Sequence, residues 1–227
     1  MIFRQLFDHS SYTFSYLLAA SDHRAIIIDP VQEKVPLYLQ LIEALGLQLI
    51  FSVDTHVHAD HITGAGLLQQ QTGCTLLISD KSPVSCAHVA IFSEEKPIVC
   101  GDVLLQPIYT PGHTDDSFCF LLGERVFTGD TLLIRGTGRT DFQNGDAAMQ
   151  YDSIFQKLLT LPEETLVFPG HDYNGMQCST IGEERLHNPR LQVTSKQAYV
   201  DLMASLDLPQ PHLMDVALPL NLKCGRN

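Results

Sequence analysis

The sequence lacks the features that would place the chain in a membrane, on nucleic acid or around a zinc finger. No stretch approaches the roughly 18 consecutive apolar residues that a transmembrane helix needs. Positive charge is scarce: 14 Lys and Arg stand against 26 Asp and Glu, and the formal net charge of −12 disfavours nucleic acid and anionic membrane surfaces as partners. The six cysteines form no CxxC pair, so they give no zinc-finger signal.

The N-terminus also lacks the character of a targeting segment. MIFRQLFDHSSYTF carries an early Asp8 and is neither a signal peptide nor an Arg- and Ser-rich, acid-poor transit leader. We therefore expect a cytoplasmic protein, or a mitochondrial-matrix protein if the chain is a mature eukaryotic one. We also expect all six cysteines to be free thiols in a reducing compartment.

What is present is an ordinary globular composition with alternating strands and helices. The 227 residues, 44% of them hydrophobic, suit one generous domain or two small ones. Helical spacing predicts helices over 31–45, 61–71, 146–160 and, with a break at Asn188-Pro189, 176–206. Short apolar runs predict strands over 2–7, 12–19, 24–29, 47–53, 75–79, 103–109, 117–122, 125–128 and 166–168. Strands and helices in both halves favour an α/β fold with two sheets and helices outside.

Histidine and aspartate gather where apolar strands give way to polar loops. The strongest local signal is His56-x-His58-x-Asp60-His61, in which residues 56, 58 and 60 of an extended segment project the same way. Three further strand-end loops contain His113 in PGHT, Asp130 in TGDT and His171 in PGHD. Imidazole and carboxylate bind zinc, iron and manganese, so these loops predict a metal site.

These motifs, THVHADH, PGHT, TGDTL and PGHD in that order, resemble the metallo-β-lactamase superfamily between Thr55 and Asp172. The resemblance implies an αββα sandwich, here as one domain over 1–227 with a short helical tail over about 174–227. A finer resemblance, to the persulfide dioxygenases, extends over nearly the whole chain. It rests on THVHADHITG, TGDTLLIRGTGRTDFQ, HDY, EERLHNPRL and NLKCG. That family uses one iron to oxidise glutathione persulfide with O2 to sulfite and glutathione.

The resemblance implies specific roles for the metal-type residues. The family's Fe(II) ligands, one ion per chain, fall on His56, His113 and Asp130. A second group matches the second-metal ligands of related binuclear hydrolases, and the dioxygenase resemblance implies that it hydrogen-bonds ligands and substrate instead. This second group consists of His58, Asp60, His61 and His171.

The expected substrate contacts are local positive or polar groups, because glutathione carries two carboxylates. Arg139 is expected either to bind a carboxylate or to support its loop through Asp141. The other candidates are Tyr173, Arg190, Lys223 and Cys224. Thr137 stands where many relatives have a cysteine, so a mechanism that needs a thiol at that position is in doubt.

Two other functions remain open from the residues. A glyoxalase II-type hydroxyacylglutathione hydrolase would use the same residues to hold two metals, for example zinc, and attack a thioester. A metallo-β-lactamase-fold nuclease would need basic clusters that the sequence does not have. For the dioxygenase, a separate rhodanese-type sulfurtransferase is an expected partner, and a homodimer is left open.

Overall fold

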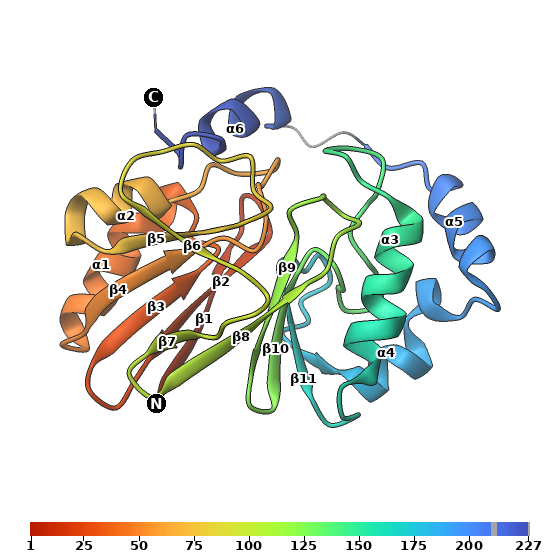
Figure 1. The fold of residues 1–227 in the computed structure, drawn as a ribbon, viewed down its shortest axis with the longest axis horizontal. Coiled ribbons are helices and arrows are strands. Elements are labelled where there is room, and N and C mark those ends of the chain that lie inside the picture. Colours follow the sequence, from red (N-terminus) through yellow and green to blue (C-terminus); the bar gives the residue numbers. More distant parts are fainter. Residues whose placement is uncertain (210–212, 227) are drawn as a thin grey trace. The chain divides into compact units, whose positions relative to one another are not determined.

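A computed structural model of the protein describes residues 1–209 and 213–226. The chain divides into two compact units, which are taken one at a time below. The first unit contains residues 1–105 and, within the described part of the C-terminal segment, 213–226; the second contains 106–209. Both units combine β-sheet with helices (Figure 1). The single domain over 1–227 stays a prediction.

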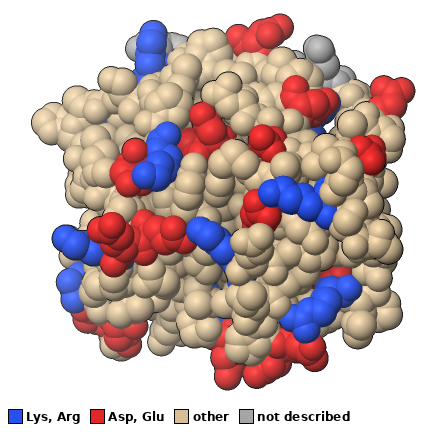
Figure 2. Space-filling model, turned by 45° about the vertical axis from the view of Figure 1, so that its right-hand side comes forward, with Lys and Arg blue, Asp and Glu red and all other residues tan. Residues whose placement is uncertain are grey.

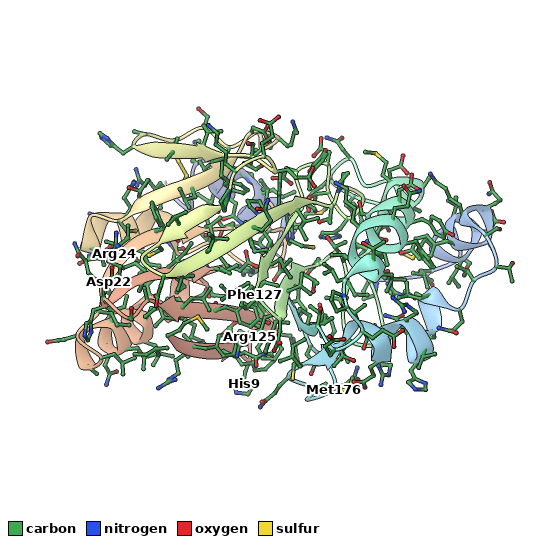
Figure 3. The ribbon with its side chains drawn as sticks, turned by 60° about the horizontal axis from the view of Figure 1, so that its bottom comes forward. His9, Asp22, Arg24, Arg125, Phe127 and Met176 are labelled. Carbon is green, nitrogen blue, oxygen red and sulfur yellow. A yellow bond between two sulfur atoms is a disulfide. The ribbon has the colours of Figure 1, made fainter. Side chains whose placement is uncertain are left out.

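The first unit is built on a six-stranded sheet in the order β1-β2-β3-β4-β5-β6. Strands β1, β2 and β3 pair antiparallel, and β3 to β6 pair parallel. β2 is buried along its whole length, as is β3 after its first residue, which explains their near-continuous apolar sequences. At the turn between them, Asp22 and Arg24 lie side by side as an exposed ion pair of 2.6 Å (Figure 3). The six strands are Ile2–Asp8, Thr13–Ala19, Arg24–Ile28, Gln48–Val53, Thr75–Ser79 and Val89–Phe92.

Helices cover this sheet and close the core of the first unit. A 3-10 turn over Gln32–Lys34 leads into α1 (Val35–Ala44), which has a proline in its first turn. Helix α2 (Ala65–Thr72) ends at Gly73, whose φ of 74° is the left-handed conformation that glycine adopts without strain. The C-terminal helix of the unit is α6 (Met214–Asn221).

The boundary between the units falls within strand β8 (Val103–Tyr109). The first part of β8 pairs antiparallel with β7 (Ile98–Cys100) inside the first unit. Its second part pairs antiparallel with β9 inside the second unit. The second sheet accordingly has the order β12-β11-β10-β9-β8-β7.

The second unit carries the remaining strands and the helices that pack on them. β9 pairs antiparallel with β10, β10 runs parallel to β11, and β12 closes the edge. Buried side chains of these strands form one core with Ile181 of α4, Tyr199 of α5 and Ile154 of the turn after α3. The strands are Phe118–Leu122, Arg125–Gly129, Leu166–Pro169 and Ser179–Thr180; the α-helices are α3 (Ala147–Asp152), α4 (Ile181–His187) and α5 (Lys196–Ala204).

The structure departs from the predicted elements in a few places. The helix expected from residue 61 begins at Ala65, because residues 58–63 are held by side-chain hydrogen bonds described below instead of by helical ones. The helix expected over 146–160 is α3 followed by a π-helical turn over Ser153–Lys157 and a 3-10 turn over Leu158–Thr160. Strands β6, β7 and β12 were not predicted, and helix α6 lies in the expected helical tail but beyond the residues to which helical spacing assigned a helix.

Candidate metal centre

In the first unit, the metal-type residues occupy the loop between β4 and α2. Asp29, which follows β3, organises the start of this loop: its carboxylate accepts hydrogen bonds from the Thr55 backbone N–H at 2.6 Å and the Thr55 hydroxyl at 3.0 Å. The Thr55 hydroxyl also lies 2.9 Å from His56 Nδ1. A partner at Nδ1 orients the His56 ring and leaves Nε2 as the atom available to a metal.

His58 is almost fully buried, as is His61. The Nε2 atom of His58 lies 3.1 Å from the buried carboxylate of Asp29, and its Nδ1 atom is buried without a hydrogen bond. Burial lowers the pKa of His58, but the negative charge and hydrogen bond of Asp29, with Asp54 and Asp60 nearby, raise it overall to about 10. A cation binding at Nδ1 would therefore displace a proton.

Asp60 and His61 complete the donors of this loop. His61 Nδ1 lies 2.9 Å from Asp60 Oδ2, and Thr13 Oγ1 lies 3.3 Å from the same carboxylate oxygen. One ligand atom each from His58, Asp60 and His61 fall within 4.8 Å of one another. The first unit thus brings together three of the four residues predicted as a second shell or second metal set.

Asn221, at the end of α6, fixes the backbone of this loop by hydrogen bonds. The Asn221 amide donates to the carbonyls of His58 and His61, at 2.8 Å each, and its oxygen accepts the Thr63 N–H at 2.9 Å. The Gly66 N–H donates to the carbonyl of Cys224, which lies three residues after Asn221. We call the segment 221–226 the C-terminal clasp. Sequence reasoning noted Asn221 within a motif but did not predict this contact.

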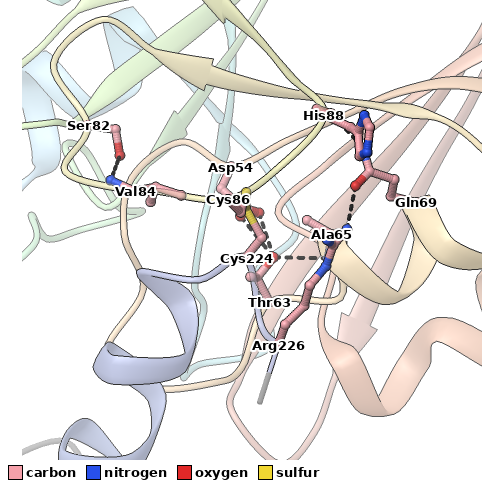
Figure 4. Close-up of a disulfide and its surroundings, with 10 residues drawn as sticks. All are labelled: Asp54, Thr63, Ala65, Gln69, Ser82, Val84, Cys86, His88, Cys224 and Arg226. Atoms are coloured by element: carbon pink, nitrogen blue, oxygen red, sulfur yellow. Dashed lines mark hydrogen bonds between the residues drawn. A yellow bond between two sulfur atoms is a disulfide. The ribbon is translucent and has the colours of Figure 1, made fainter.

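The expectation of six free thiols is wrong for two of them. Cys86 and Cys224 form a disulfide with a Cα–Cα distance of 6.2 Å (Figure 4). Cys224 is therefore not a free thiol and ties the clasp to the loop that precedes β6, whereas its predicted contact with the substrate stays a prediction. The pair is separated by 138 residues, so no local spacing could reveal it. The free cysteines are Cys74, Cys100, Cys119 and Cys178.

In the second unit, two strand-end histidines lie next to one strand-end carboxylate, that of Asp130. His113 Nε2 lies 3.6 Å from Asp130 Oδ2, and His171 Nε2 lies 3.6 Å from Asp130 Oδ1. These distances are too long for hydrogen bonds. Asp130 Oδ1 is buried and makes no hydrogen bond. Gly170 leaves room for this atom, since a Cβ there would lie 2.6 Å from it. Two imidazole nitrogens and an unsatisfied carboxylate oxygen are a donor set that suits a divalent metal.

His113 is oriented by the loop that follows Asp130. Its Nδ1 lies 2.7 Å from the Arg139 carbonyl, so Nδ1 carries the proton and Nε2 presents its lone pair. The Gly138 N–H donates to the Asp130 carbonyl at 2.7 Å. A side chain at Gly138 would strike this carbonyl at 2.1 Å and His113 Nδ1 at 2.8 Å, which explains the glycine.

The Arg139 side chain is engaged within its own unit. Its guanidinium makes two 2.7 Å bonds to Asp141, donates to the carbonyls of Pro209 and Leu208, and covers the Phe142 ring at 4.3 Å. Of the two roles expected for Arg139, these contacts favour loop support. The hydrogen bonds that Arg139 donates, together with its charge, lower the pKa of the Asp141 carboxyl.

Arg190 is different, because it is half-buried and forms no ion pair among the described residues. Its guanidinium donates to the carbonyl and hydroxyl of Thr137. Burial lowers the pKa of Arg190. A cation held in this way keeps donors available for an anionic partner.

The remaining predicted substrate contacts lie at the surface. Tyr173 is 63% exposed, and its ring stacks parallel to that of His171 with centroids 6.0 Å apart. Lys223 is exposed in the clasp. Neither position conflicts with contact to a ligand.

Two residues that sequence reasoning did not single out fix the loop after Asp130. Glu184 is fully buried and accepts from the Arg135 backbone, the Arg135 guanidinium and the Asn188 amide. Asn188 also donates to the carbonyls of Leu133 and Gly136. The EERLHNPRL stretch thus supports the loop after Asp130. The signal in the sequence that could have indicated this role is an acidic residue, Glu184, placed four residues before an amide residue, Asn188.

Surface charge shows little basic clustering. On the face drawn in Figure 2, Lys and Arg side chains stand beside Asp and Glu side chains. Within the second unit, Arg185 pairs with Glu163 at 2.5 Å and Lys196 with Asp152 at 2.5 Å. None of the helices in the described part of the chain is long and apolar enough to cross a membrane.

Comparisons with known proteins agree with the motifs. The metallo-β-lactamase superfamily profile matches residues 11–171. Human mitochondrial persulfide dioxygenase ETHE1 is 45% identical over 230 residues, 99% of this chain and 89% of that protein. The crystal structure of ETHE1 from Myxococcus xanthus matches with a TM-score of 0.95 and 49% identity, covering 100% of both chains. The hydroxyacylglutathione hydrolase of Xanthomonas axonopodis pv. citri is 37% identical over 163 residues, 70% of this chain and 61% of that protein.

These matches confirm the predicted α/β, metallo-β-lactamase-like fold. They also confirm the finer resemblance, because the persulfide dioxygenase match extends over almost the whole chain whereas the hydrolase match is partial. The chain therefore belongs to the metallo-β-lactamase superfamily and, within it, to the persulfide dioxygenase family.

Proposed function

We propose that this chain oxidises glutathione persulfide with O2 to sulfite and glutathione, at one Fe(II) held by His56, His113 and Asp130. The observation that carries the proposal is the 45% identity to human persulfide dioxygenase over 99% of the chain. Two imidazoles and one carboxylate are also the ligand set of non-haem Fe(II) oxygenases, which leaves open positions on the metal.

The donor atoms on each unit support metal binding there. Hydrogen bonding at Nδ1 orients the rings of both His56 and His113, and in each of them Nε2 is the nitrogen that we assign to the metal. Asp130 supplies a buried oxygen without a hydrogen bond. Bound Fe(II) would supply open coordination positions for the persulfide sulfur and O2.

The chain's own residues would bind and orient the substrate. Arg190, a half-buried guanidinium without an ion pair, suits a glutathione carboxylate. Tyr173 and Lys223 offer an exposed hydroxyl and an exposed ammonium. We assign Arg139 to loop support, given its contacts with Asp141 and with backbone carbonyls. In this proposal His58, Asp60, His61 and His171 bind no second metal and hydrogen-bond around the site instead.

The test is anaerobic loading with Fe(II), metal analysis, and O2 uptake with glutathione persulfide. We expect one iron per chain, O2 consumption and sulfite formation, with loss of activity on chelation and recovery when Fe(II) is restored. Asp130→Asn should lose iron, whereas Asp152→Asn, at an exposed carboxylate paired with Lys196, should retain it. Iron-loaded protein that consumes no O2 would overturn the proposal.

A second candidate, thioester hydrolysis at two metals, is favoured by one specific observation. A full second set of donors is present, and one of them, His58 Nδ1, is buried without a hydrogen bond. Two tightly bound metals per chain together with hydrolysis of lactoylglutathione would support this candidate. One iron and no hydrolysis would exclude it.

The proposed reaction also needs a supply of persulfide. A separate rhodanese-type sulfurtransferase would provide it, and mixing the two enzymes should couple sulfur transfer to O2 uptake. The homodimer and the compartment of the chain stay predictions.

A further inference from the structure

A chain of buried polar groups runs from α5 to the loop behind His113, inside the second unit. Tyr199 on α5 and Gln150 on α3 are both fully buried. The Tyr199 hydroxyl donates to Gln150 Oε1 at 2.8 Å, and Gln150 Nε2 donates to the Gly138 carbonyl at 3.1 Å. Neither residue belongs to the metal-type or substrate residues described above.

The chemistry of the groups fixes the direction of this chain. A backbone carbonyl can only accept, so the Gln150 amide must turn its NH2 toward Gly138 and its oxygen toward Tyr199. Burial raises the pKa of Tyr199 to about 12, so its hydroxyl stays a neutral donor at working pH. The Tyr199 oxygen also lies 3.2 Å from Thr137 Oγ1, which joins the residue before Gly138 to the same network.

The end of the chain is the group that orients His113. The Gly138 N–H is bound by the Asp130 carbonyl at 2.7 Å, and its C=O is bound by Gln150, so this residue is fixed at both of its backbone groups. The next carbonyl, that of Arg139, accepts from His113 Nδ1 at 2.7 Å. The Arg139 carbonyl lies in the peptide unit that follows the one held by Gln150, so loss of the Gln150 bond would free the Gly138 and Arg139 backbone torsions that place this carbonyl beside the imidazole.

The backbone of Gln150 also packs closely against Gly112, the residue before His113. A Cβ on Gly112, which precedes His113 and has a φ of 140°, would lie 2.3 Å from the Gln150 backbone. The α3 N-cap Asp146 donates its N–H to the Gly112 carbonyl at 2.9 Å, and Ser153 donates to the Pro111 carbonyl at 2.7 Å. The N-cap of α3 and the π-helical turn that follows the helix therefore bind the loop before His113, and the Gln150 side chain binds the loop after Asp130.

We infer that Gln150, supported by Tyr199, is a positioning residue that holds the Arg139 carbonyl against His113 Nδ1 and thereby presents His113 Nε2 to the metal. This inference rests on the proposed function for its metal. Thr137 takes part through its hydroxyl, whose oxygen lies 3.2 Å from the Tyr199 oxygen and 3.2 Å from the Arg190 guanidinium.

The test compares three variants with the wild type. Tyr199→Phe removes only the hydroxyl, and Gln150→Met removes the amide at similar length. The double variant removes both the Tyr199 hydroxyl and the Gln150 amide. Neither group then stays buried without the other, so we expect the fold to be retained. Tyr151→Phe is the matched control: it removes a hydroxyl from the same helix α3 and keeps the ring stacked on Phe155.

Two readouts separate positioning from a general loss of stability. In metal-free protein, 15N NMR of the His113 ring should show the Nδ1–H tautomer in the wild type and in Tyr151→Phe, and a mixture of tautomers in the other three variants. Competition with a chelator should show a metal dissociation constant raised about five- to tenfold in those three variants. The absorption bands of the Co(II)-loaded protein should shift in the same variants.

The two proposals fail in different ways. If wild-type protein binds iron and consumes O2 but the His113 tautomer and metal affinity of the double variant equal those of the wild type, the inference is overturned and the proposed function stands. If wild-type protein binds no metal, the proposed function fails, and the tautomer in metal-free protein still decides whether Gln150 positions His113.

Discussion

Two buried polar atoms without hydrogen bonds are the most direct sign that the fold provides ligands for a cation. His58 Nδ1 and Asp130 Oδ1 are buried without hydrogen bonds, and a buried polar atom left unpaired costs about 1–3 kcal/mol. Glycine at residue 170 keeps space free beside Asp130, where any side chain would collide. Such an arrangement is unfavourable for a merely structural polar cluster but is expected where a cation completes the contacts.

At this scale the sequence predicted the donors but not what orients them. His56, His113 and Asp130 were predictable because each imidazole or carboxylate follows an apolar strand. Asp29 was not predicted, although its carboxylate binds Thr55 and His58. It lies 29 residues before His58 at the end of an ordinary strand, and only the parallel pairing of β3 with β4 brings it to the loop.

Asp8 provides a prediction about pH. Burial alone would raise the pKa of its carboxyl, but the Ser11 hydroxyl and N–H, together with Lys34 at 3.2 Å, lower the pKa below 3.8. Because the folded-state pKa is the lower one, the carboxylate stabilises the fold above about pH 4 and loses this effect as pH falls through the folded-state pKa. Asp8→Asn should therefore be about 1 kcal/mol less stable than wild type at neutral pH.

The check on Asp8 is urea unfolding as a function of pH. The difference between wild type and Asp8→Asn should shrink as pH falls below about 4. Asp207→Asn, at an exposed carboxylate outside this cluster, should show no such pH dependence. A difference for Asp8→Asn that is the same at pH 7 and at pH 3 would contradict the argument.

At the scale of elements, helix α6 shows how a short helix can stabilise a loop that is distant in sequence, because its last residue, Asn221, is also the first residue of the C-terminal clasp. Helix α6 contains Pro219 and spans only 8 residues, so its periodicity gave no prediction. The buried strands and the long helix α1 were predictable because their apolar spacing is regular. Residues 61–64 were mistaken for the start of a helix, because the local pattern does not reveal that Asn221 binds the carbonyls of His58 and His61.

We predict that Asn221→Ala destabilises the first unit by about 3 kcal/mol, since it leaves the carbonyls of His58 and His61 and the N–H of Thr63 unpaired. Asn221→Asp should keep the bond to Thr63 but place a carboxylate oxygen against the two carbonyls. Urea unfolding measures the first effect. Hydrogen exchange at the Thr63 amide separates the variants, because it should be fast in Asn221→Ala and slow in Asn221→Asp.

The control for this prediction is Asn174→Ala, which removes an exposed amide from a loop of the second unit. It should leave both the unfolding midpoint and the Thr63 exchange rate unchanged. If Thr63 exchanges equally slowly in all three variants, the amide of Asn221 does not hold the loop.

At the scale of the whole molecule, the first unit is discontinuous in sequence. Along the chain, one of its segments (1–105) comes before the entire second unit, and the other (the described residues 213–226) comes after it. Length and composition left one or two domains open, and nothing in the order of elements indicated that the tail returns to the first unit. Long-range pairing of this kind depends on tertiary packing, such as that of Cys224 in the core with α1 and α2.

The Cys86–Cys224 disulfide connects these two segments and closes a loop of 138 residues. Such a cross-link restricts the unfolded chain, and in the chain-entropy model its reduction should lower the free energy of unfolding by up to about 5 kcal/mol. Urea unfolding with and without a phosphine reductant measures this difference. Cys86→Ser should be as unstable as the reduced wild type and insensitive to reductant, whereas Cys178→Ser, which removes an exposed free thiol, should behave as wild type. Alkylation of the unfolded, unreduced protein should label four cysteines, and labelling of all six would show that the bond does not form.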